Sequence, residues 1–185
     1  KIRFKFIDLG GGFGISYNKK DKKINLTEYS NLVNNFKNKF KCKIIFEPGR
    51  SIIGNAGVLV SKIQYIKKRE NKFFIILDAG MNDFMRPALY DAFHDIIPIV
   101  KSGKKMRGIV EFVGPVCESS CNFGKYKSYQ KLDENSYVAI NNVGAYGSSL
   151  SSNYNTRPLP TEILVEKNKF KVVRKRQSIS ELIKN

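Results

Sequence analysis

The sequence has one histidine, His94, and only three cysteines in 185 residues. A structural zinc site takes four ligands, mostly cysteine and histidine. Cys117 and Cys121 are four residues apart, but no second cysteine or histidine pair accompanies them. We therefore predict no metal site. An odd number of cysteines without a secretory context also favours a reducing compartment, the cytoplasm.

Long apolar runs are also missing. None approaches the roughly 20 residues that a membrane-spanning helix needs, so we predict no membrane segment. Acidic residues are few, 16 against 33 Lys and Arg, and the formal charge is +17. This charge raises the question of nucleic acid. The lysines are scattered, however, without aromatic–basic interleaving or a recognition-helix pattern, so we expect a solvated basic surface and no nucleic-acid partner.

Apolar residues make up 42% of the chain, which is typical of a folded protein. Residues 1–8 alternate as a strand and lead into Gly10, Gly11 and Gly12. The dinucleotide fingerprint would need a third glycine where Ile15 stands, so that reading fails. Three successive glycines still suit two roles equally, a phosphate-binding loop or a flexible turn.

A helix is predicted next, with Thr27 as its N-cap and an apolar stripe from Tyr29 to Phe40. The strand at residues 43–46 follows it. Strand, helix and strand form a βαβ unit, so the two strands should be parallel neighbours that end on the same side. In α/β barrels that side carries the active site. The second strand ends at Glu47-Pro48-Gly49-Arg50, which places an acid and a cationic fork together.

From Gly57 onward strand-like runs dominate, and we predict an antiparallel β domain. The expected strands lie near residues 58–63, 73–77, 108–113, 136–140, 161–165 and 170–173, with a charged turn at 67–72 and a short helix at 178–183.

Three loops of this half carry reactive side chains. Arg86 and Tyr90 are one helical turn apart, and Arg86 suits a carboxylate ligand or, alternatively, a surface salt bridge. Cys117 and Glu118 follow a Gly-Pro turn, and the alternative for Cys117 is a buried, inert thiol. Tyr146 lies in a tight loop and offers a phenol.

Six motifs occur in order: DLGGGFG (8–14), EPGR (47–50), DAGMN (78–82), RPALY (86–90), GPVCES (114–119) and GAY (144–146). Together they resemble the diaminopimelate decarboxylase family over almost the whole chain. The resemblance implies an α/β plus all-β fold: the last units of a PLP-binding (β/α)8 barrel at residues 1–56, then an antiparallel β-barrel or sandwich domain at residues 57–185. The family's PLP-binding lysine lies in the first half of the barrel, so we expect this chain to be the C-terminal portion of the enzyme.

The resemblance also implies the site. Cys117 is the implied catalytic proton donor. The implied cofactor-binding residues are Gly10, Gly11, Gly12, Glu47, Gly49, Arg50 and Tyr146. The implied substrate-binding residues are Arg50, Arg86, Tyr90, Glu118 and Tyr146. Cys121 stands where the family has an acidic residue, and a disulfide between it and Cys117 would block that thiol.

The implied reaction is the PLP-dependent decarboxylation of meso-2,6-diaminopimelate to L-lysine and CO2, in a homodimer with shared active sites. Arg86 favours this substrate over ornithine or lysine, because it would attract a distal carboxylate and repel a bare ammonium. The alternatives are a related ornithine or arginine decarboxylase, a non-catalytic decarboxylase-like regulator, and a basic nucleic-acid-binding module.

Overall fold

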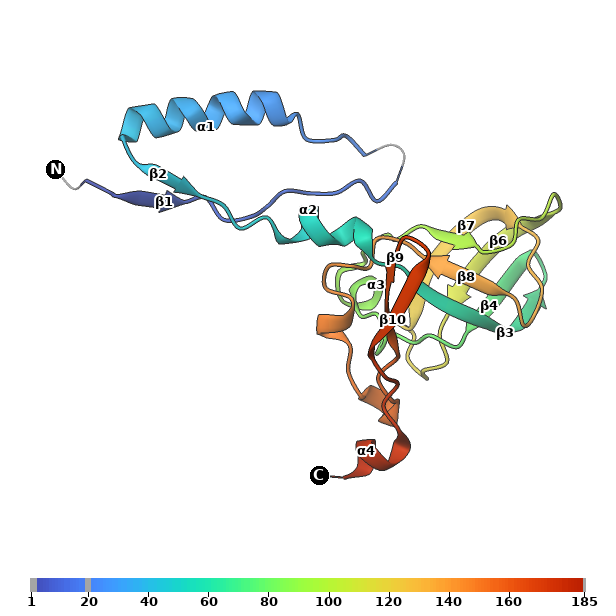
Figure 1. Ribbon diagram of the computed structural model, residues 1–185. Coiled ribbons are helices and arrows are strands. Elements are labelled where there is room, and N and C mark those ends of the chain that lie inside the picture. Colours follow the sequence, from blue (N-terminus) through green and yellow to red (C-terminus); the bar gives the residue numbers. More distant parts are fainter. Residues whose placement is uncertain (1–2, 19–20, 185) are drawn as a thin grey trace.

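The computed structural model describes residues 3–18 and 21–184. Its first part is a βαβ unit of β1 (Phe6–Asp8), α1 (Leu26–Phe40) and β2 (Lys43–Ile45). The strands pair in parallel, as predicted, and Ile7 lies opposite Ile44. In Figure 1 this unit extends as an arm from the rest of the molecule. The predicted first strand is longer than the observed one, and its residues 1–2 lie outside the described residues.

The predicted N-cap of α1 is wrong by two residues. Asn25 holds this position, and its side-chain oxygen accepts hydrogen bonds from the backbone N–H groups of Thr27 and Glu28. Asn is as strong an N-cap as Ser and better than Thr, because its short side chain reaches these unpaired donors. The helix therefore begins at Leu26.

A six-stranded sheet forms the body of the molecule. Its strands lie in the order β5-β8-β3-β4-β6-β7. Their bounds are β3 (Leu59–Arg69), β4 (Lys72–Leu77), β5 (Ile96–Pro98), β6 (Lys105–Val113), β7 (Asn122–Gln130) and β8 (Tyr137–Ile140). Strands β5 and β7 were not predicted, and the turn between β3 and β4 is confined to Glu70 and Asn71, since residues 67–69 belong to β3.

The prediction of an entirely antiparallel domain is wrong, because β4 and β6 pair in parallel, with Phe73 opposite Val110. The other pairs of this sheet are antiparallel. After β4 the chain passes through α3 (Arg86–Tyr90) to β5, at the far edge of the sheet, before it returns as β6. This crossover lets β6 run in the same direction as β4.

The sheet curls, so that its two edge strands approach each other. The Tyr126 hydroxyl accepts the N–H of Ile96 at 2.8 Å, and the Tyr129 hydroxyl donates to the Ile96 carbonyl at 2.5 Å. Burial raises the pKa of both phenols, which keeps them neutral as hydrogen-bonding groups. The core inside the curl includes Ile63, Ile75, Phe112 and Val138.

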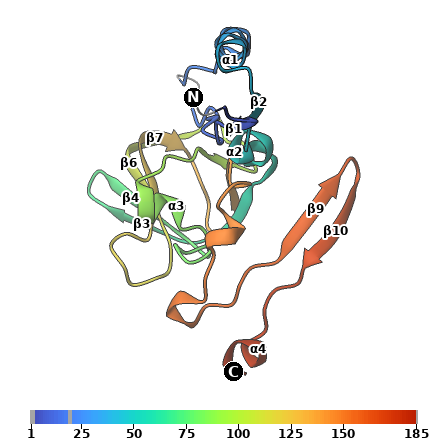
Figure 2. The ribbon, with the colours of Figure 1, turned by 90° about the vertical axis from the view of Figure 1, so that its left-hand side faces the viewer.

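Two further pieces complete the chain. Helix α2 (Gly49–Ile53) and the 3-10 turn η1 (Gly54–Ala56) connect the arm to the sheet. After the 3-10 turns η2 (Ser148–Leu150) and η3 (Tyr154–Thr156), β9 (Glu162–Glu166) and β10 (Lys169–Arg174) form a hairpin that stands apart from the sheet in Figure 2. Helix α4 (Ile179–Ile183) begins with a capping box at Ser178, where a helix was predicted. No helix within the described residues is long and apolar enough to cross a membrane.

Candidate active site

The carboxyl ends of β1 and β2 lead into the glycine loop and the Glu47-Pro48-Gly49-Arg50 stretch, which lie side by side as predicted. The N–H of Glu47 donates to the carbonyl of Gly10 at 2.8 Å, so the two loops are joined by backbone. Gly10 and Gly12 adopt φ values of 68° and 80°, which favour glycine.

The middle glycine leaves no room for a side chain. A Cβ on Gly11 would lie 2.5 Å from the carbonyl oxygen of Glu47. Among the described residues, the N–H groups of Gly11 and Gly12 donate to no protein acceptor. The loop thus presents bare backbone donors, which is the chemistry that a phosphate ligand requires.

Arg50 and Tyr146 meet across the junction between the arm and the sheet. The Arg50 guanidinium lies 5.7 Å from the centroid of the Tyr146 ring, in a cation–π contact. The junction is tight, since the N–H of Gly144 donates to the Gly54 carbonyl at 3.1 Å. The sequence did not predict this contact, although it singled out both residues.

Arg86 lies at the start of α3 and is 6% exposed, so the alternative of a surface salt bridge is wrong. Its Nη1 donates to the Tyr17 hydroxyl at 2.8 Å and approaches Nε2 of His94 at 2.9 Å. Its guanidinium also lies 5.3 Å from the centroid of the Tyr17 ring. Sequence reasoning missed Tyr17 altogether and considered His94 only as a metal ligand.

Tyr90 is at the other end of α3, and its side chain is 63% exposed. The predicted helical turn is present, since α3 spans Arg86–Tyr90. Its two functional candidates lie in different environments, Arg86 buried in the protein and Tyr90 facing outward.

Cys117 is exposed, so the alternative of a buried, inert thiol is wrong. The Asn155 side-chain amide approaches its Sγ at 3.7 Å, and the Tyr154 hydroxyl donates to the Glu118 carboxylate at 2.5 Å. This hydrogen bond and the Glu118 charge raise the pKa of Tyr154. The segment at η3 therefore holds both functional candidates of the loop, which the sequence did not predict.

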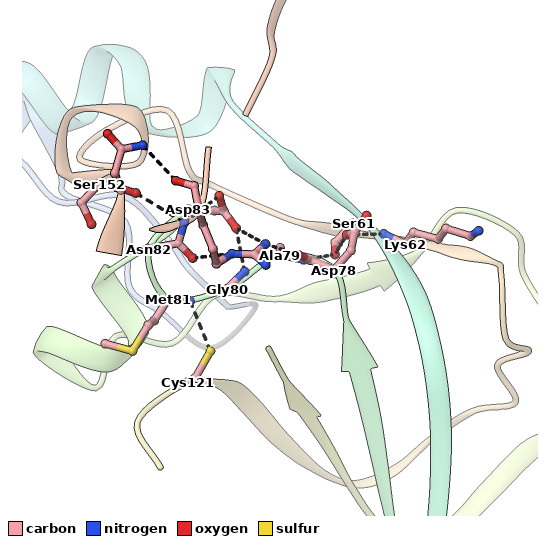
Figure 3. A network of polar contacts seen from close by, with 12 residues as sticks. Ser61, Lys62, Asp78, Ala79, Gly80, Met81, Asn82, Asp83, Cys121 and Ser152 are labelled. Atoms are coloured by element: carbon pink, nitrogen blue, oxygen red, sulfur yellow. Dashed lines mark hydrogen bonds and ion pairs between the residues drawn. The ribbon is translucent and has the colours of Figure 1, made fainter. Parts of the chain in front are cut away.

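Cys121 is buried and, like Cys117, carries a free thiol, so no disulfide blocks Cys117. Its Sγ accepts the N–H of Met81 at 3.3 Å, as Figure 3 shows. A Cβ on Gly114 would lie 2.5 Å from the same sulfur. Cys121 thus packs the Cys117 loop against the loop after β4.

The loop after β4 is itself fixed by a polar network (Figure 3). The N–H of Gly80 donates to Asp83 at 2.7 Å, and Ser61 donates to Asp78 at 2.5 Å. Arg157 also donates to the Asn82 side chain at 2.9 Å. The described residues contain no group of three or more His, Cys, Asp and Glu that could hold a metal ion.

We call Arg86, Tyr17 and His94 the Arg86 cluster. It lies close to the segment that follows the glycine loop, since Tyr17 contacts Arg86 and the Asn142 side chain donates to the Ser16 carbonyl. In contrast, no hydrogen bond or ion pair within the described residues joins the Cys117 loop to the glycine loop.

Residues 13–144 match the model of the pyridoxal-dependent decarboxylase C-terminal sheet domain. A curated diaminopimelate decarboxylase of Aquifex aeolicus is 40% identical over 97% of this chain and 42% of its own length. The crystal structure of diaminopimelate decarboxylase from Helicobacter pylori in complex with L-lysine is 44% identical, with a TM-score of 0.87 over 96% of this chain and 43% of that one. The enzyme from M. jannaschii gives a TM-score of 0.91 at 36% identity, over 98% and 43%. The chain spans less than half the length of these relatives.

Proposed function

Because the chain belongs to the pyridoxal-dependent decarboxylases, whose C-terminal sheet domain it contains, we propose that the protein decarboxylates meso-2,6-diaminopimelate to L-lysine and CO2. The observation that carries the choice of substrate is Arg86. It is a buried guanidinium whose polar contacts, among the described residues, are the neutral side chains of Tyr17 and His94. Buried cations are normally paired with anions, so an anionic ligand is the natural counter-ion.

The residues at the ends of β1 and β2 fit pyridoxal phosphate. Its phosphate group would meet the N–H groups of Gly11 and Gly12, with Gly49 and Arg50 beside it, while the N–H of Gly10 donates to Asp8 and fixes the start of the loop. The absence of a Cβ at Gly11 supports this assignment. It lets the glycine loop pack directly against the backbone of Glu47, so that the loop N–H groups and the Glu47 carboxylate lie at the same strand ends. The Glu47 carboxylate is exposed at the same strand end and would pair with the pyridine nitrogen.

When bound in this site, pyridoxal phosphate would supply an electron sink for the pair left at the α-carbon by the departure of CO2. The Glu47 carboxylate keeps the ring nitrogen protonated for this purpose. Cys117 donates a proton to the α-carbon, and Glu118 binds the distal ammonium. Tyr146 would contact the cofactor, Arg86 would bind the distal carboxylate of the substrate, and the exposed Tyr90 would contact the same end of the substrate.

The site is shared between two subunits in this proposal. Its support is that, among the described residues, no hydrogen bond or ion pair joins the Cys117 loop to the glycine loop of the same chain. The exposed Cys117 and Glu118 would complete the site of a partner subunit in a homodimer. The free thiols of the three cysteines agree with a cytoplasmic location.

We assign the arm to the last units of a (β/α)8 barrel. Its two strands cannot form an independent core, because a two-stranded sheet buries too little apolar surface. Phe4, Phe6, Leu32 and Phe40 are all exposed by 46% or more. Further barrel strands and helices would cover these side chains.

The test is CO2 release by the full reading frame that carries this chain, supplied with pyridoxal phosphate. Diaminopimelate, lysine and ornithine are compared at equal concentrations. We expect release from diaminopimelate alone. Release from ornithine or lysine would assign the protein to a related decarboxylase, and release from none of them, with cofactor bound, would favour a regulatory relative.

A further inference from the structure

We infer that His94 is a positioning residue. Its neutral imidazole accepts a hydrogen bond from the Arg86 guanidinium and holds it in place, so that the positive charge of Arg86 stays available for a carboxylate ligand. The inference rests on the proposed function, in which Arg86 binds the distal carboxylate of the substrate. It adds a residue that neither the motifs nor the family resemblance assigned to the site.

The protonation of His94 follows from its two partners. Nδ1 lies 2.8 Å from the carbonyl oxygen of Asn141, which can only accept, so Nδ1 carries the proton. Nε2 lies 2.9 Å from Nη1 of Arg86, which can only donate, so Nε2 carries a lone pair. Both contacts are satisfied by one species, the neutral imidazole with its proton on Nδ1.

The surroundings of His94 keep the ring in this place. The side chain has no exposed surface. Its ring packs edge-on against Phe84 and Tyr17, with centroids 4.6 Å and 4.9 Å away. Burial, together with the charges of Arg86 and Arg50, lowers the pKa of His94 to about 4, although the Asn141 carbonyl acts in the opposite direction.

Neutral partners have a specific consequence for Arg86. A carboxylate in the place of the imidazole would pair with the guanidinium and cancel its charge. Tyr17 and His94 instead occupy Nη1 with neutral acceptors, and the hydrogen bonds of Arg86 within the described residues all come from that nitrogen. Nε and Nη2 are left for an anion, with the fork already oriented.

The same contacts link Arg86 to the glycine loop. Tyr17 lies five residues after Gly12 in the sequence, on the segment that leaves the glycine loop. His94 is fixed by Asn141, which directly follows β8. The guanidinium is therefore held between the glycine-loop segment and the sheet, which sets its distance from the reacting end of the substrate.

The experiment compares two variants of the full-length holoenzyme, each of which keeps one of the two polar positions of the imidazole. In His94→Gln the side-chain oxygen takes the place of Nε2 and still accepts from Arg86. In His94→Asn the amide takes the place of Nδ1, so the Asn141 contact is kept and the acceptor for Arg86 is lost. Calorimetry measures the binding of L-lysine and of pentane-1,5-diamine, which differ only in the carboxylate.

We expect His94→Asn to weaken L-lysine binding by about tenfold or more, the usual scale for one hydrogen bond to a charged group, and to leave diamine binding unchanged. His94→Gln should restore L-lysine binding to within about threefold of the wild type. Equal weakening for both ligands, unchanged L-lysine binding in His94→Asn, or failure of His94→Gln to restore it would each overturn the inference.

Two arms keep this result separate from the proposed function. A wild-type enzyme that releases no CO2 from diaminopimelate would refute the function, whereas an active enzyme with unaffected variants would refute only the role of His94. If His94→Asn does not fold, nitrogen NMR of wild-type histidine decides, with the His94 signals identified by their loss in His94→Gln. A proton on Nε2 at neutral pH would overturn the inference.

Discussion

The buried His94 should make the protein lose stability in mild acid, before its carboxylates titrate. The folded-state pKa is about 4, against an ordinary value of 6.5. The unfolded chain therefore binds a proton at a higher pH than the folded protein does, and stability rises with pH across this interval. The contribution is complete above about pH 6.5 and is lost as the pH falls towards 4.

The size of the effect follows from the shift. One pKa unit corresponds to about 1.4 kcal/mol, so the full interval amounts to roughly 3 kcal/mol of unfolding free energy. The carboxylates of Asp21, Glu111 and Glu181, whose pKa values are lowered, lose their contributions at a more acidic pH, below about 4.5. Above about pH 4.5 the histidine effect is thus separated from them.

The assay is urea unfolding of the full-length wild-type protein and of its His94→Gln variant at half-unit steps from pH 7.5 to 4.5. Gln does not titrate, so the difference in free energy between the two proteins isolates the histidine. We expect this difference to move against the wild type by up to about 1.4 kcal/mol per unit below pH 6.5. Parallel pH curves would refute the reasoning, because they would mean that the imidazole ionises equally in both states.

Three substitutions test the proposed site in the full-length enzyme. Gly11→Ala should abolish cofactor absorbance, since its Cβ would lie 2.5 Å from a carbonyl oxygen, whereas Gly14→Ala, with open space around its Cβ, should not. Cys117→Ala should slow product formation by about 100-fold or more and retain the absorbance; loss of absorbance would contradict its role as a proton donor. Arg86→Met should raise KM for diaminopimelate by roughly 10- to 100-fold, and an unchanged KM would exclude a substrate contact.

Local patterns in the sequence predicted the elements that repeat a simple period. The apolar stripe of α1 and the runs in β4 and β6 are such cases. Strands β5 and β7 were not predicted. Strand β5 has only three residues and ends in Pro98, and β7 contains many polar residues and Gly124 in a left-handed conformation. The parallel pairing of β4 with β6 depends on where the chain returns after a crossover, which no local pattern encodes.

The candidate site divides along the same line. The contact between the glycine loop and Glu47 was predictable, because parallel neighbours in a βαβ unit end on the same side. The Arg86 cluster was not, since Tyr17 is 69 residues away in sequence and meets Arg86 only through the tertiary fold. A sequence pattern also gives no burial for an isolated histidine, and burial is what separates a hydrogen-bond acceptor from a metal ligand or a surface cation here.

Two buried ions in this fold illustrate how a structural charge differs from one kept for a ligand. Glu111 is 5% exposed and has two cationic partners, Lys72, which pairs with it, and Lys125, which lies 3.0 Å away; the neutral amide of Asn122 also donates to it. Burial alone would raise the pKa of Glu111, but these partners hold it below its usual value. Arg86 has only neutral partners among the described residues.

The two ions should therefore respond to neutralisation in opposite ways. Glu111→Gln removes an anion whose partners are all protein groups, so it should cost roughly 1–3 kcal/mol of unfolding free energy and leave KM unchanged. Arg86→Met removes a buried cation that no protein anion balances, and this gain offsets the loss of its hydrogen bonds to Tyr17 and His94, so the net change in stability should be small while KM for diaminopimelate rises. Urea unfolding and steady-state kinetics on both variants separate the two cases. If Arg86→Met unfolded the protein, the charge of Arg86 would have to be structural, and the anionic ligand would have to bind elsewhere. If Glu111→Gln altered KM, Glu111 would not be a purely structural charge.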